Sequence, residues 1–266
     1  MKKMLTVTID GIQVDVEEGA TVLEAAQRAG VYIPTLCYHP CLPPIGACRL
    51  CAVEVEGMKG IHTACTLPCT DGMVVHTDTP AIKRFRQDIL WLILSEHPHA
   101  CLICEKRDEC DLKTCEFDIP VEQRCCSKWN ECELKEIVDA VGLPEDIPLP
   151  EYKSRGFPVI EDEPLIFIDR NLCILCERCI RACQDLRGIG AIGFIYRGRN
   201  SMTAPPPNMN LSESGCRFCC TCVEVCPSGA LRDKVDFNGK PREEVIIACK
   251  YACPARIDVP RYVRLI

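Results

Sequence analysis

The pattern of apolar and polar residues predicts a β-hairpin followed by a helix at the start of the chain. Between residues 5 and 16, apolar residues alternate with polar ones on both sides of the turn dipeptide Asp10-Gly11. Thr21 and Glu24 then have the spacing of a capping box, which marks the start of a helix, and Gly30 marks its end. The predicted buried face of this helix consists of Val22, Ala25, Ala26 and Ala29.

A second helix is predicted to begin at Thr79, a capping residue that is followed by proline at the first helical position. The pattern predicts that this helix ends at His97-Pro98. Its predicted apolar face consists of Ile82, Phe85, Ile89 and either Leu92 or Ile93.

The cysteine content changes this picture, because 24 of the 266 residues are cysteine. Secreted disulfide scaffolds have a comparable content, but Met1 leads into an alternating strand and not into the apolar stretch of a signal peptide. No run approaches the ~18 apolar residues of a membrane span. We therefore expect a reducing cytoplasm, where clustered thiols bind metal, and no membrane partner. The formal net charge of −7 predicts no nucleic-acid partner.

The first cysteine group follows the first predicted helix. Its spacing is a lengthened form of the plant-type arrangement that binds a [2Fe–2S] cluster. The four predicted ligands are Cys37, Cys48, Cys51 and Cys65. Two strands, a helix and a cysteine loop in this order predict a β-grasp [2Fe–2S] ferredoxin domain. Cys41 and Cys69 fall outside the four and are interpreted as small buried packing residues.

Residues 173–226 contain two copies of the run C-x2-C-x2-C-x3-C, which wraps a [4Fe–4S] cubane. The fourth cysteine of each run ligates the other cluster in two-cluster proteins of this type. The predicted ligand sets are Cys173, Cys176, Cys179 and Cys226 for one cubane, and Cys183, Cys216, Cys219 and Cys222 for the other. A bacterial-type two-[4Fe–4S] ferredoxin domain is therefore predicted. The alternative is a zinc-stapled scaffold without a redox role, although this run crowds a tetrahedral zinc site.

A histidine precedes three further cysteines at cluster spacing, which predicts a [4Fe–4S] cluster with one histidine ligand. The predicted ligands are His97, Cys101, Cys104 and Cys110. His99 competes with His97 for this role. The two-residue step from His99 to Cys101 leaves too little chain to reach around a cube, so His97 is preferred.

The segment Cys104-x5-Cys110 is echoed 22 residues later by Cys126-x5-Cys132, and each copy is followed by an acidic residue, leucine and lysine. Four thiols in this stretch are candidate ligands of an additional [4Fe–4S] cluster. They are Cys115, Cys125, Cys126 and Cys132. The alternative is that local repetition retained cysteines that bind no metal, since adjacent cysteines seldom bind the same iron comfortably.

Two stretches without cysteine ligands complete the pattern. Residues 142–164 contain five prolines and several acidic residues, which predicts a solvated linker. The segment from Gly188 to Gly193 matches G-x-G-x-x-G, but a dinucleotide fingerprint must leave a strand and open a helix. Because this segment follows Cys183 and precedes the strand-like residues 194–196, it is interpreted as a glycine turn close to a cluster.

Several of these stretches carry a family resemblance. The segments 33–38, 48–51 and 97–112 resemble the N-terminal part of the large iron–sulfur subunit of respiratory complex I. The same front end occurs in NAD(P)-linked iron-only hydrogenases and formate dehydrogenases. The resemblance implies that His97 and the three cysteines after it bind a [4Fe–4S] cluster. It also implies two partners, a flavin- and NAD(H)-binding subunit and a thioredoxin-like [2Fe–2S] subunit.

The end of the chain carries a second resemblance. The stretch from Cys249 to Tyr262 resembles the opening of the flavin- and NADPH-binding small subunit of glutamate synthase. This resemblance implies an iron–sulfur segment before an FAD- and NADPH-binding domain, on this chain or on a partner. Cys249 and Cys253 would form a partial site that needs ligands from elsewhere. The alternative is a short docking tail that ends in an ordinary strand.

Together these patterns predict an α+β chain with one [2Fe–2S] cluster, three [4Fe–4S] clusters and a candidate fourth. The predicted domains are a β-grasp [2Fe–2S] domain over residues 1–79, a helical His/Cys3 region over 80–141, a linker over 142–164, a two-[4Fe–4S] ferredoxin domain over 165–240 and the glutamate-synthase-like segment over 241–266.

The resemblance implies an electron-transfer subunit of a cytoplasmic NAD(P)H- and ferredoxin-linked oxidoreductase, with electron bifurcation as a further expectation. FAD or FMN and NAD(P) are expected on partner modules, and no catalytic residue is expected on this chain. The alternative within the same resemblance is the front end of an NAD(P)-linked hydrogenase or formate dehydrogenase.

Overall fold

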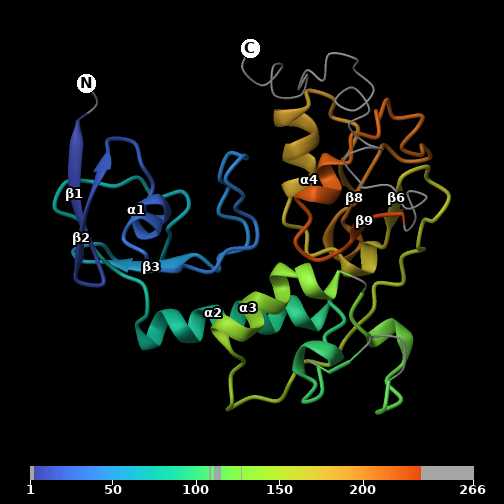
Figure 1. Cartoon of the computed structure of the whole chain (residues 1–266), viewed down its shortest axis with the longest axis horizontal. Coiled ribbons are helices and arrows are strands. Elements are labelled where there is room, and N and C mark those ends of the chain that lie inside the picture. Colours follow the sequence, from blue (N-terminus) through green and yellow to red (C-terminus); the bar gives the residue numbers. More distant parts are fainter. Residues whose placement is uncertain (1–2, 108, 111–114, 127, 235–266) are drawn as a thin grey trace.

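The computed structural model describes residues 3–107, 109–110, 115–126 and 128–234. Figure 1 shows a sheet-containing N-terminal part, two helices side by side along the lower edge of the view, and a part with short strands and helices on the other side. This mixture of helices and strands agrees with the predicted α+β class. The candidate ligands Cys249 and Cys253 lie outside the described residues.

The N-terminal part is built on a five-stranded sheet with the strand order β2-β1-β5-β3-β4. Strands β1 and β5 are parallel, and the other neighbouring strands are antiparallel. The strands are β1 (Met4–Ile9), β2 (Ile12–Glu17), β3 (Ala52–Val55), β4 (His62–Thr63) and β5 (Val74–His76). The cysteine loop, which contains the four predicted [2Fe–2S] ligands, lies between β2 and β5 in the sequence and packs against this sheet.

The predicted hairpin and first helix are confirmed. Asp10 and Gly11 both have positive φ (48° and 84°), as a tight hairpin turn requires, and the Asp10 carboxylate accepts hydrogen bonds from the backbone and side chain of Thr77. Helix α1 (Val22–Arg28) begins with the complete capping box, in which Thr21 and Glu24 each bond the other's backbone N–H. Its buried residues include Val22, Ala25 and Ala26.

The ends of the second helix agree with the prediction, and its buried face agrees in part. Helix α2 (Pro80–Ser95) is capped by Thr79 and buries Ile82, Arg86, Leu90 and Leu94. Ile82 is buried as predicted and Ile89 and Ile93 pack half-buried against the core, but Leu92 is exposed, so the most buried positions lie about one residue of rotation from the predicted face. The reason is Arg86, whose guanidinium donates to the carbonyls of Leu50 and Ala52 at 3.0 and 2.8 Å. A prediction from hydrophobicity treats this arginine as a polar residue and therefore places it on the solvent side of the helix.

Helix α3 (Glu133–Val141) packs against α2 and extends the interior below the cysteine loop. The buried cluster at this contact joins residues from the loop, from both helices and from the segment between them. Its fully buried members include Leu36, Leu50, Leu90, Leu94, Leu102 and Leu134. Cys132 and Trp129 belong to the same cluster. The middle of the chain is therefore one packed body with the [2Fe–2S] loop.

Up to residue 234, where the described residues end, the C-terminal part has two small antiparallel sheets and two short helices. Its strands and helices are β6 (Ile166–Ile168) paired with β9 (Leu231–Asp233), β7 (Gly193–Ile195) paired with β8 (Met202–Ala204), α4 (Arg178–Arg181) and α5 (Thr221–Glu224). Single helical turns join the elements of the chain. They lie at Ala100–Ile103, Val121–Gln123, Trp129–Glu131, Arg170–Leu172, Ala182–Leu186 and Gly198–Asn200. The segment from Gly188 leads into β7, which confirms a glycine turn before a strand.

The predicted linker over residues 142–164 is less solvated than expected. Ile160 forms a β-bridge with Ile168, and Glu163 is buried, where its carboxylate accepts from the backbone N–H of Leu211 at 2.9 Å. The prolines prevent a helix or ladder, as predicted, yet this segment packs along the C-terminal part, where the Glu163 carboxylate satisfies a backbone donor.

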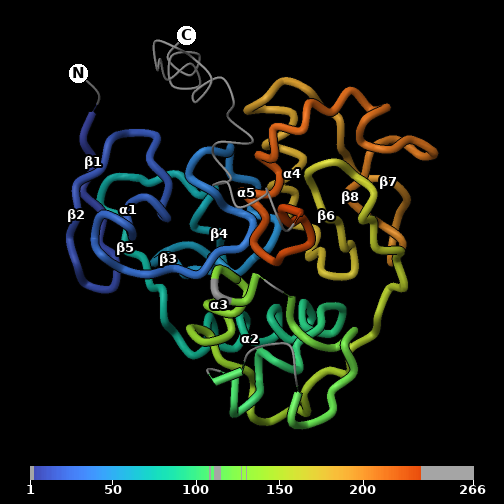
Figure 2. Tube along the Cα trace, turned by 45° about the vertical axis from the view of Figure 1, so that its right-hand side comes forward, coloured from blue at the N-terminus to red at the C-terminus, as the bar shows by residue number. Residues whose placement is uncertain are grey.

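Arginines connect the N-terminal and C-terminal parts of the molecule. Arg181 in α4 donates to the carbonyls of Cys37 and Pro43 in the cysteine loop. Arg178 in the same helix forms a bidentate ion pair with Glu133 at 2.6 and 2.7 Å. Figures 1 and 2 both show the loop reaching from the N-terminal sheet towards α4. The relative position of the two cysteine-rich parts is thus set by charge-assisted hydrogen bonds.

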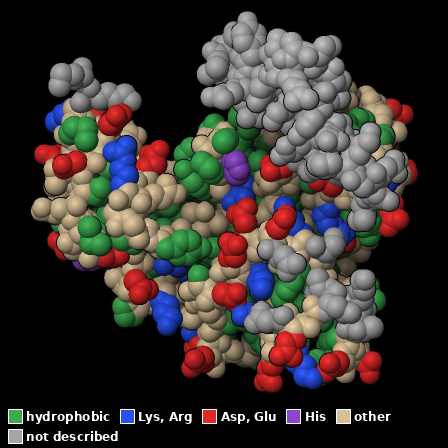
Figure 3. Space-filling model, viewed as in Figure 1, with side chains coloured by type: hydrophobic (Ala, Val, Ile, Leu, Met, Phe, Trp, Pro, Cys, Tyr) green, Lys and Arg blue, Asp and Glu red, His purple; other side chains and the backbone are tan. Residues whose placement is uncertain are grey.

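The surface carries both signs of charge. Figure 3 shows acidic and basic side chains interspersed over the described part of one face. None of the helices in the described ranges combines the length and the apolar character that crossing a membrane requires.

Arg86→Met is expected to destabilise the protein. Methionine keeps the length of the side chain but leaves two buried carbonyls, of Leu50 and Ala52, without their donors, which costs about 1–3 kcal/mol for each group. For a chain of this size, the midpoint of thermal unfolding should fall by roughly 4–10 °C in the iron-loaded protein under anaerobic conditions. Arg84→Met is the matched control on the exposed side of the same helix. An equal fall in both variants would contradict a specific role for Arg86.

Candidate iron–sulfur sites

The structure brings the four predicted [2Fe–2S] ligands together. The sulfur atoms of Cys51 and Cys65 are 3.4 Å apart, and the backbone N–H of Cys48 donates to Cys37 Sγ at 3.4 Å. Hydrogen bonds from the Cys48 and Cys65 thiols lower the pKa of Cys37 to about 2. Four thiols that contact one another in this way fit the ligand set of one small cluster.

The backbone of the cysteine loop is shaped for close approach to sulfur. Leu36 N–H donates to Cys48 Sγ at 3.4 Å, and Arg49, between two predicted ligands, has a left-handed φ of 62°. Gly46 also has positive φ (63°), and a Cβ there would lie 3.2 Å from Thr63 Oγ1. Glycine is favoured at this turn by its left-handed conformation, and a Cβ would need the Thr63 side chain to shift by a few tenths of an ångström.

The two cysteines outside this set behave differently from each other. Cys69 is buried, as predicted. Cys41 is exposed, so its interpretation as a buried packing residue is wrong. It follows His39-Pro40 in the part of the loop that leaves the sheet, and its backbone N–H donates to His39 Nδ1 at 3.2 Å.

The first predicted cubane set also converges. A small cavity in the C-terminal part is lined by Cys173, Cys176, Cys179 and Cys226, with Thr203 and Ser228. Burial raises the pKa of Cys176 to about 12 and that of Cys179 well above its ordinary value. These thiols are therefore protonated at neutral pH without metal, and ligation must release protons.

The second predicted set repeats the backbone of the first. The residue two positions after the first cysteine, Leu175 or Phe218, has positive φ and donates its N–H to that cysteine's sulfur at 3.4 Å in both copies. The residue four positions after it, Glu177 or Cys220, is again left-handed and precedes the short helix α4 or α5. The four thiols of this set lie close enough for the charge of one to affect the pKa of another. They are Cys183, Cys216, Cys219 and Cys222. Two equivalent loops with inward sulfur atoms fit two equivalent cubanes.

His97 has a buried nitrogen that faces no hydrogen-bond partner in the described structure. Its Nδ1 lies 2.7 Å from the carbonyl oxygen of Pro98, which can only accept, so Nδ1 carries the proton and Nε2 presents a lone pair. Burial lowers the pKa of His97 to about 4, which keeps the ring neutral. His99 instead places Nδ1 at 2.9 Å from the Leu94 carbonyl, within the end of α2. A neutral, orphaned imidazole nitrogen fits a metal ligand.

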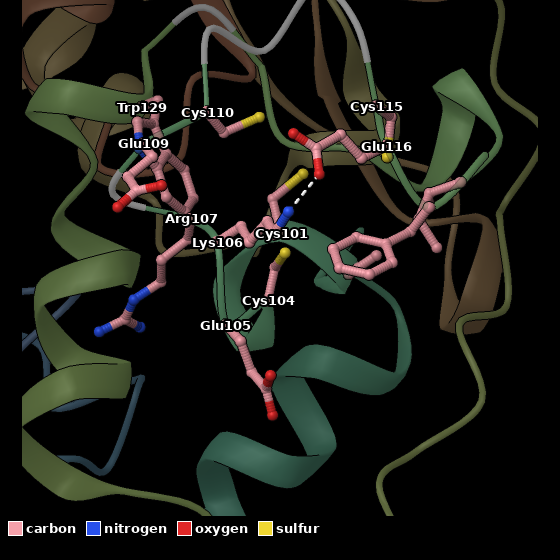
Figure 4. Close-up of a pocket in the computed structure, with 13 residues that line it drawn as sticks. Cys101, Cys104, Glu105, Lys106, Arg107, Glu109, Cys110, Cys115, Glu116 and Trp129 are labelled. Atoms are coloured by element: carbon pink, nitrogen blue, oxygen red, sulfur yellow. Dashed lines mark hydrogen bonds and ion pairs between the residues drawn. The ribbon is translucent and has the colours of Figure 1, made fainter.

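The three cysteines predicted to join His97 lie in a different cavity from it. Figure 4 shows Cys101, Cys104 and Cys110 directed into a pocket of about 560 Å³, together with Cys115. His97 does not line this pocket. It lines a second cavity, of about 300 Å³, with Cys48, Cys173 and Cys176. The structure thus groups Cys115 with the first three cysteines.

The remaining candidate ligands, Cys125, Cys126 and Cys132, lie between the middle region and the C-terminal part. Cys126 Sγ is 3.9 Å from the carbonyl oxygen of Ser228, and Cys132 caps α3. The thiol and backbone N–H of Cys125 donate to Cys101, which lowers the pKa of Cys101 to about 6. None of these three cysteines lines the 560 Å³ pocket.

Over the described residues, no three His, Cys, Asp or Glu side chains are grouped to hold a single metal ion. A cubane is held differently, because each of its ligands binds a separate iron atom.

Comparisons with known proteins place these sites in a family. Three family models match in order along the chain. They are a 2Fe-2S iron–sulfur cluster binding domain over residues 2–80, the NADH-ubiquinone oxidoreductase-G iron–sulfur binding region over 86–123, and the ferredoxin-like domain of NADH-quinone oxidoreductase subunit 3 over 163–232.

Individual relatives agree with these models. The NADH-quinone oxidoreductase G subunit 2 of Rhizobium meliloti is 38% identical over 231 residues, which cover 86% of this chain and 24% of the relative. NADPH-Fe(3+) oxidoreductase subunit alpha of Geobacter sulfurreducens is 36% identical over 239 residues, 90% of this chain and 25% of the relative. A chain in a crystal structure of NAD+-reducing [NiFe]-hydrogenase superposes with a TM-score of 0.69 at 30% identity, over 90% of this chain and 91% of that chain.

The chain belongs to the G-type iron–sulfur subunit family of NADH-quinone oxidoreductases. This family includes the matching hydrogenase chain, and the first resemblance predicted from the sequence is confirmed at this level. The chain spans about a quarter of the length of these two curated relatives. The matched G-type binding region ends at residue 123, before Cys125, Cys126 and Cys132.

The sequence did not predict the arginines that hold the cysteine loops in place. Arg86 donates to the carbonyl of Leu50, which is 36 residues away in the sequence. Arg181 donates to the carbonyl of Cys37, which is 144 residues away. No local spacing marks such a contact. Their burial becomes visible only when the chain is folded.

Cys51→Ser is expected to remove the [2Fe–2S] cluster and leave the [4Fe–4S] clusters in place. The reason is that Cys51 contacts another predicted ligand sulfur and is fully buried within the set. Iron and acid-labile sulfide should fall by one [2Fe–2S] equivalent, and the corresponding EPR spectrum of the reduced protein should disappear. Cys69→Ser is the control, since Cys69 is also buried in the same domain but outside the set. Loss of the cluster in the control variant alone would refute this assignment.

Proposed function

We propose that this chain is an iron–sulfur electron-transfer segment of an NAD(P)H-linked, multi-subunit oxidoreductase. The observation that carries the proposal is the 300 Å³ cavity, which is lined by Cys48 of the [2Fe–2S] loop, by His97, and by Cys173 and Cys176 of the first cubane loop. Candidate ligands from three groups that are far apart in the sequence therefore lie around one shared cavity. Such an arrangement suits a relay of one electron at a time between neighbouring centres.

The proposal includes the ligand sets of a β-grasp [2Fe–2S] domain over residues 1–79 and a two-[4Fe–4S] domain over 165–240. When bound, the clusters supply one-electron carriers whose potentials range over roughly −700 to +450 mV. The protein's residues set those potentials by burial and by N–H donors such as Leu175 and Phe218, which point at cysteine sulfur. Arg181 holds the backbone of Cys37 against α4 and so fixes the distance between the two domains.

The partners in this proposal carry the flavin and nucleotide chemistry. A flavin- and NAD(H)-binding subunit, a thioredoxin-like [2Fe–2S] subunit and a ferredoxin are proposed, with an FAD- and NADPH-binding module next to Cys249 and Cys253. Electron bifurcation between the two flavins is part of this proposal. A cytoplasmic location is proposed because reduced thiols persist there. The two named relatives, an NADH-quinone and an NADPH-Fe(3+) oxidoreductase subunit, support an NAD(P)H-linked role.

A second candidate function is the front end of a hydrogenase or formate dehydrogenase. It is favoured by the hydrogenase chain, which matches 90% of this chain at 30% identity. Hydrogen or formate turnover by the complex that copurifies with the full protein would distinguish it, because this chain would then deliver electrons to or from an active site on a partner.

EPR-monitored redox titration tests the leading proposal. The anaerobically purified full protein is expected to contain iron and acid-labile sulfide, and to show low-potential [2Fe–2S] and [4Fe–4S] spectra on reduction. NADH or NADPH should produce the same spectra when the flavin partner is present. Protein stripped of iron by chelation is the control. Zinc in place of iron and sulfide, or the absence of any reducible low-potential centre, would overturn the proposal.

A further inference from the structure

Two half-buried cations are bonded to the backbone of the first cubane site. The Arg155 guanidinium donates to the carbonyl of Cys173 and, at 2.8 Å, to the carbonyl of Arg170. The Lys128 ammonium donates to the carbonyl of Cys226 at 2.6 Å. Cys173 and Cys226 are two of the four thiols that line the small cavity of this site. Two positive charges are therefore held beside two ligands of one predicted cluster.

Neither cation is neutralised by a carboxylate in the described part of the chain. Arg155 and Lys128 form no ion pair there, and the Arg155 guanidinium lies 5.2 Å from the centre of the Phe157 ring. Its Nε is buried and has no hydrogen-bond partner in the described structure. Arg178 lies beside the same thiols, but Glu133 neutralises it through the bidentate ion pair. Arg155 and Lys128 thus keep their full charge next to the cavity.

Two further charged groups near the first cubane site have opposite signs. Arg170 is buried, donates to the carbonyl of Thr203 at 3.0 Å, and lies close enough to Cys173 for their charges to interact. Glu177 lines the same cavity and carries a negative charge. Since these two balance each other, Arg155 and Lys128 leave an excess of positive charge at the site.

The second cubane site has a buried carboxylate beside it. Burial raises the pKa of Cys216, and the charge of Glu163 acts in the same direction. Glu163 is itself buried, and its carboxylate accepts from the backbone N–H of Leu211 at 2.9 Å. Over the described residues, no lysine or arginine donates to a carbonyl of this site's four cysteines. Arg187 and Arg217 belong to the surrounding loops but are exposed, so solvent and salt screen their charges.

This difference in charge acts on the two cubanes in opposite directions. Reduction adds one negative charge to a cluster, which a nearby cation stabilises and a nearby carboxylate opposes. At an effective dielectric constant of about 20, one charge at roughly 10 Å changes such an equilibrium about tenfold or slightly more. The first site therefore favours reduction, and the second disfavours it.

We propose that Arg155 and Lys128 are positioning residues of the first cubane site, and that their charges raise its reduction potential above that of the second cubane. This inference rests on the proposed electron-transfer function. The first site shares the 300 Å³ cavity with His97 and with Cys48 of the [2Fe–2S] loop. Each transfer moves one electron, so one centre is oxidised as its neighbour is reduced. An electron that reaches the pair would thus rest at this junction, and the onward step to the second cubane would be uphill.

Redox titration with EPR detection, on the full protein purified anaerobically, tests this order of potentials. The signal of the first cubane is the one that Cys173→Ser alters, and the signal of the second is the one that Cys216→Ser alters. In the wild-type protein, the first cubane is expected to be reduced at the higher potential. A second cubane that is reduced before the first would overturn the proposed order.

Substitutions of the two cations test the cause. Arg155→Met and Lys128→Met should each lower the ratio of reduced to oxidised first cubane about tenfold at a fixed ambient potential. This fall corresponds to a shift of about 59 mV for one electron. Arg155→Lys and Lys128→Arg retain the charge and should restore the wild-type ratio. An equal fall in the charge-retaining variants would assign the effect to lost packing and contradict the proposal, as would an unchanged ratio in both methionine variants.

Two further variants control for position and for sign. Arg199 donates to the carbonyls of Lys153 and Ser154, in the same segment as Arg155 but on no candidate ligand, so Arg199→Met should leave both potentials unchanged. Glu163→Gln keeps an oxygen acceptor for the Leu211 N–H but removes the charge, and should raise the potential of the second cubane. A shift in Arg199→Met as large as that in Arg155→Met, or no rise in Glu163→Gln, would contradict the assigned charge difference.

Iron and acid-labile sulfide are measured in every variant. Full content shows that the clusters are assembled and that a shift in potential reports charge. If Arg155→Met does not assemble the first cubane, Lys128→Met tests the same effect from a separate segment of the chain. Wild-type protein without iron or reducible centres would refute the electron-transfer function itself. Wild-type protein with all its clusters, together with unchanged potentials in the variants, would refute only the role of these two cations.

Discussion

Hydrogen bonds from backbone N–H groups to cysteine sulfur are the interaction on which the rest of this structure depends. They occur in the [2Fe–2S] loop, in both cubane loops and in the middle region, at 3.2–3.4 Å. A thiolate that binds iron carries negative charge into a buried place, and these donors stabilise that charge. To point several N–H groups inward, the chain must turn tightly around the sulfur atoms. The left-handed residues Arg49, Leu175 and Phe218 provide that curvature.

This requirement explains why arginines, beside the small apolar cluster of Leu42, Ala182 and Val225, join the cysteine loop to the C-terminal part. Loops that wrap clusters have little side-chain volume left for packing, and their carbonyls point outward. Arg86 and Arg181 donate to such carbonyls beside Cys51 and Cys37. Each guanidinium offers several fixed donors, so a single side chain can hold two turns of backbone. The positions of the cysteine loops are thereby fixed by the same contacts that satisfy their carbonyls.

Much of the fold could be predicted because its determinants are local. The hairpin turn at Asp10-Gly11, the capping box at Thr21 and the cap at Thr79 are each encoded within a few residues. The cubane runs are local as well. The buried face of α2 was misplaced because Arg86 is buried by partners far away in the sequence, and Cys41 was misplaced because nothing local distinguishes an exposed loop thiol from a buried one. In the middle region, spacing groups His97 with Cys101, Cys104 and Cys110, whereas the structure places His97 in a cavity with Cys48, Cys173 and Cys176.

The position of His97 gives a physical reason for an imidazole there. It lines a cavity with Cys48, Cys173 and Cys176, ligands of two other proposed clusters that carry negative charge when bound. A neutral imidazole removes one negative charge relative to a thiolate. Two unit charges ~10 Å apart interact with about 1.7 kcal/mol at an effective dielectric constant of about 20, which corresponds to roughly 70 mV for one electron. Histidine ligation raises cluster potentials in the same direction through its weaker donation. As a cluster ligand, the His97 imidazole would therefore favour reduction at this junction over the all-cysteine sites around it.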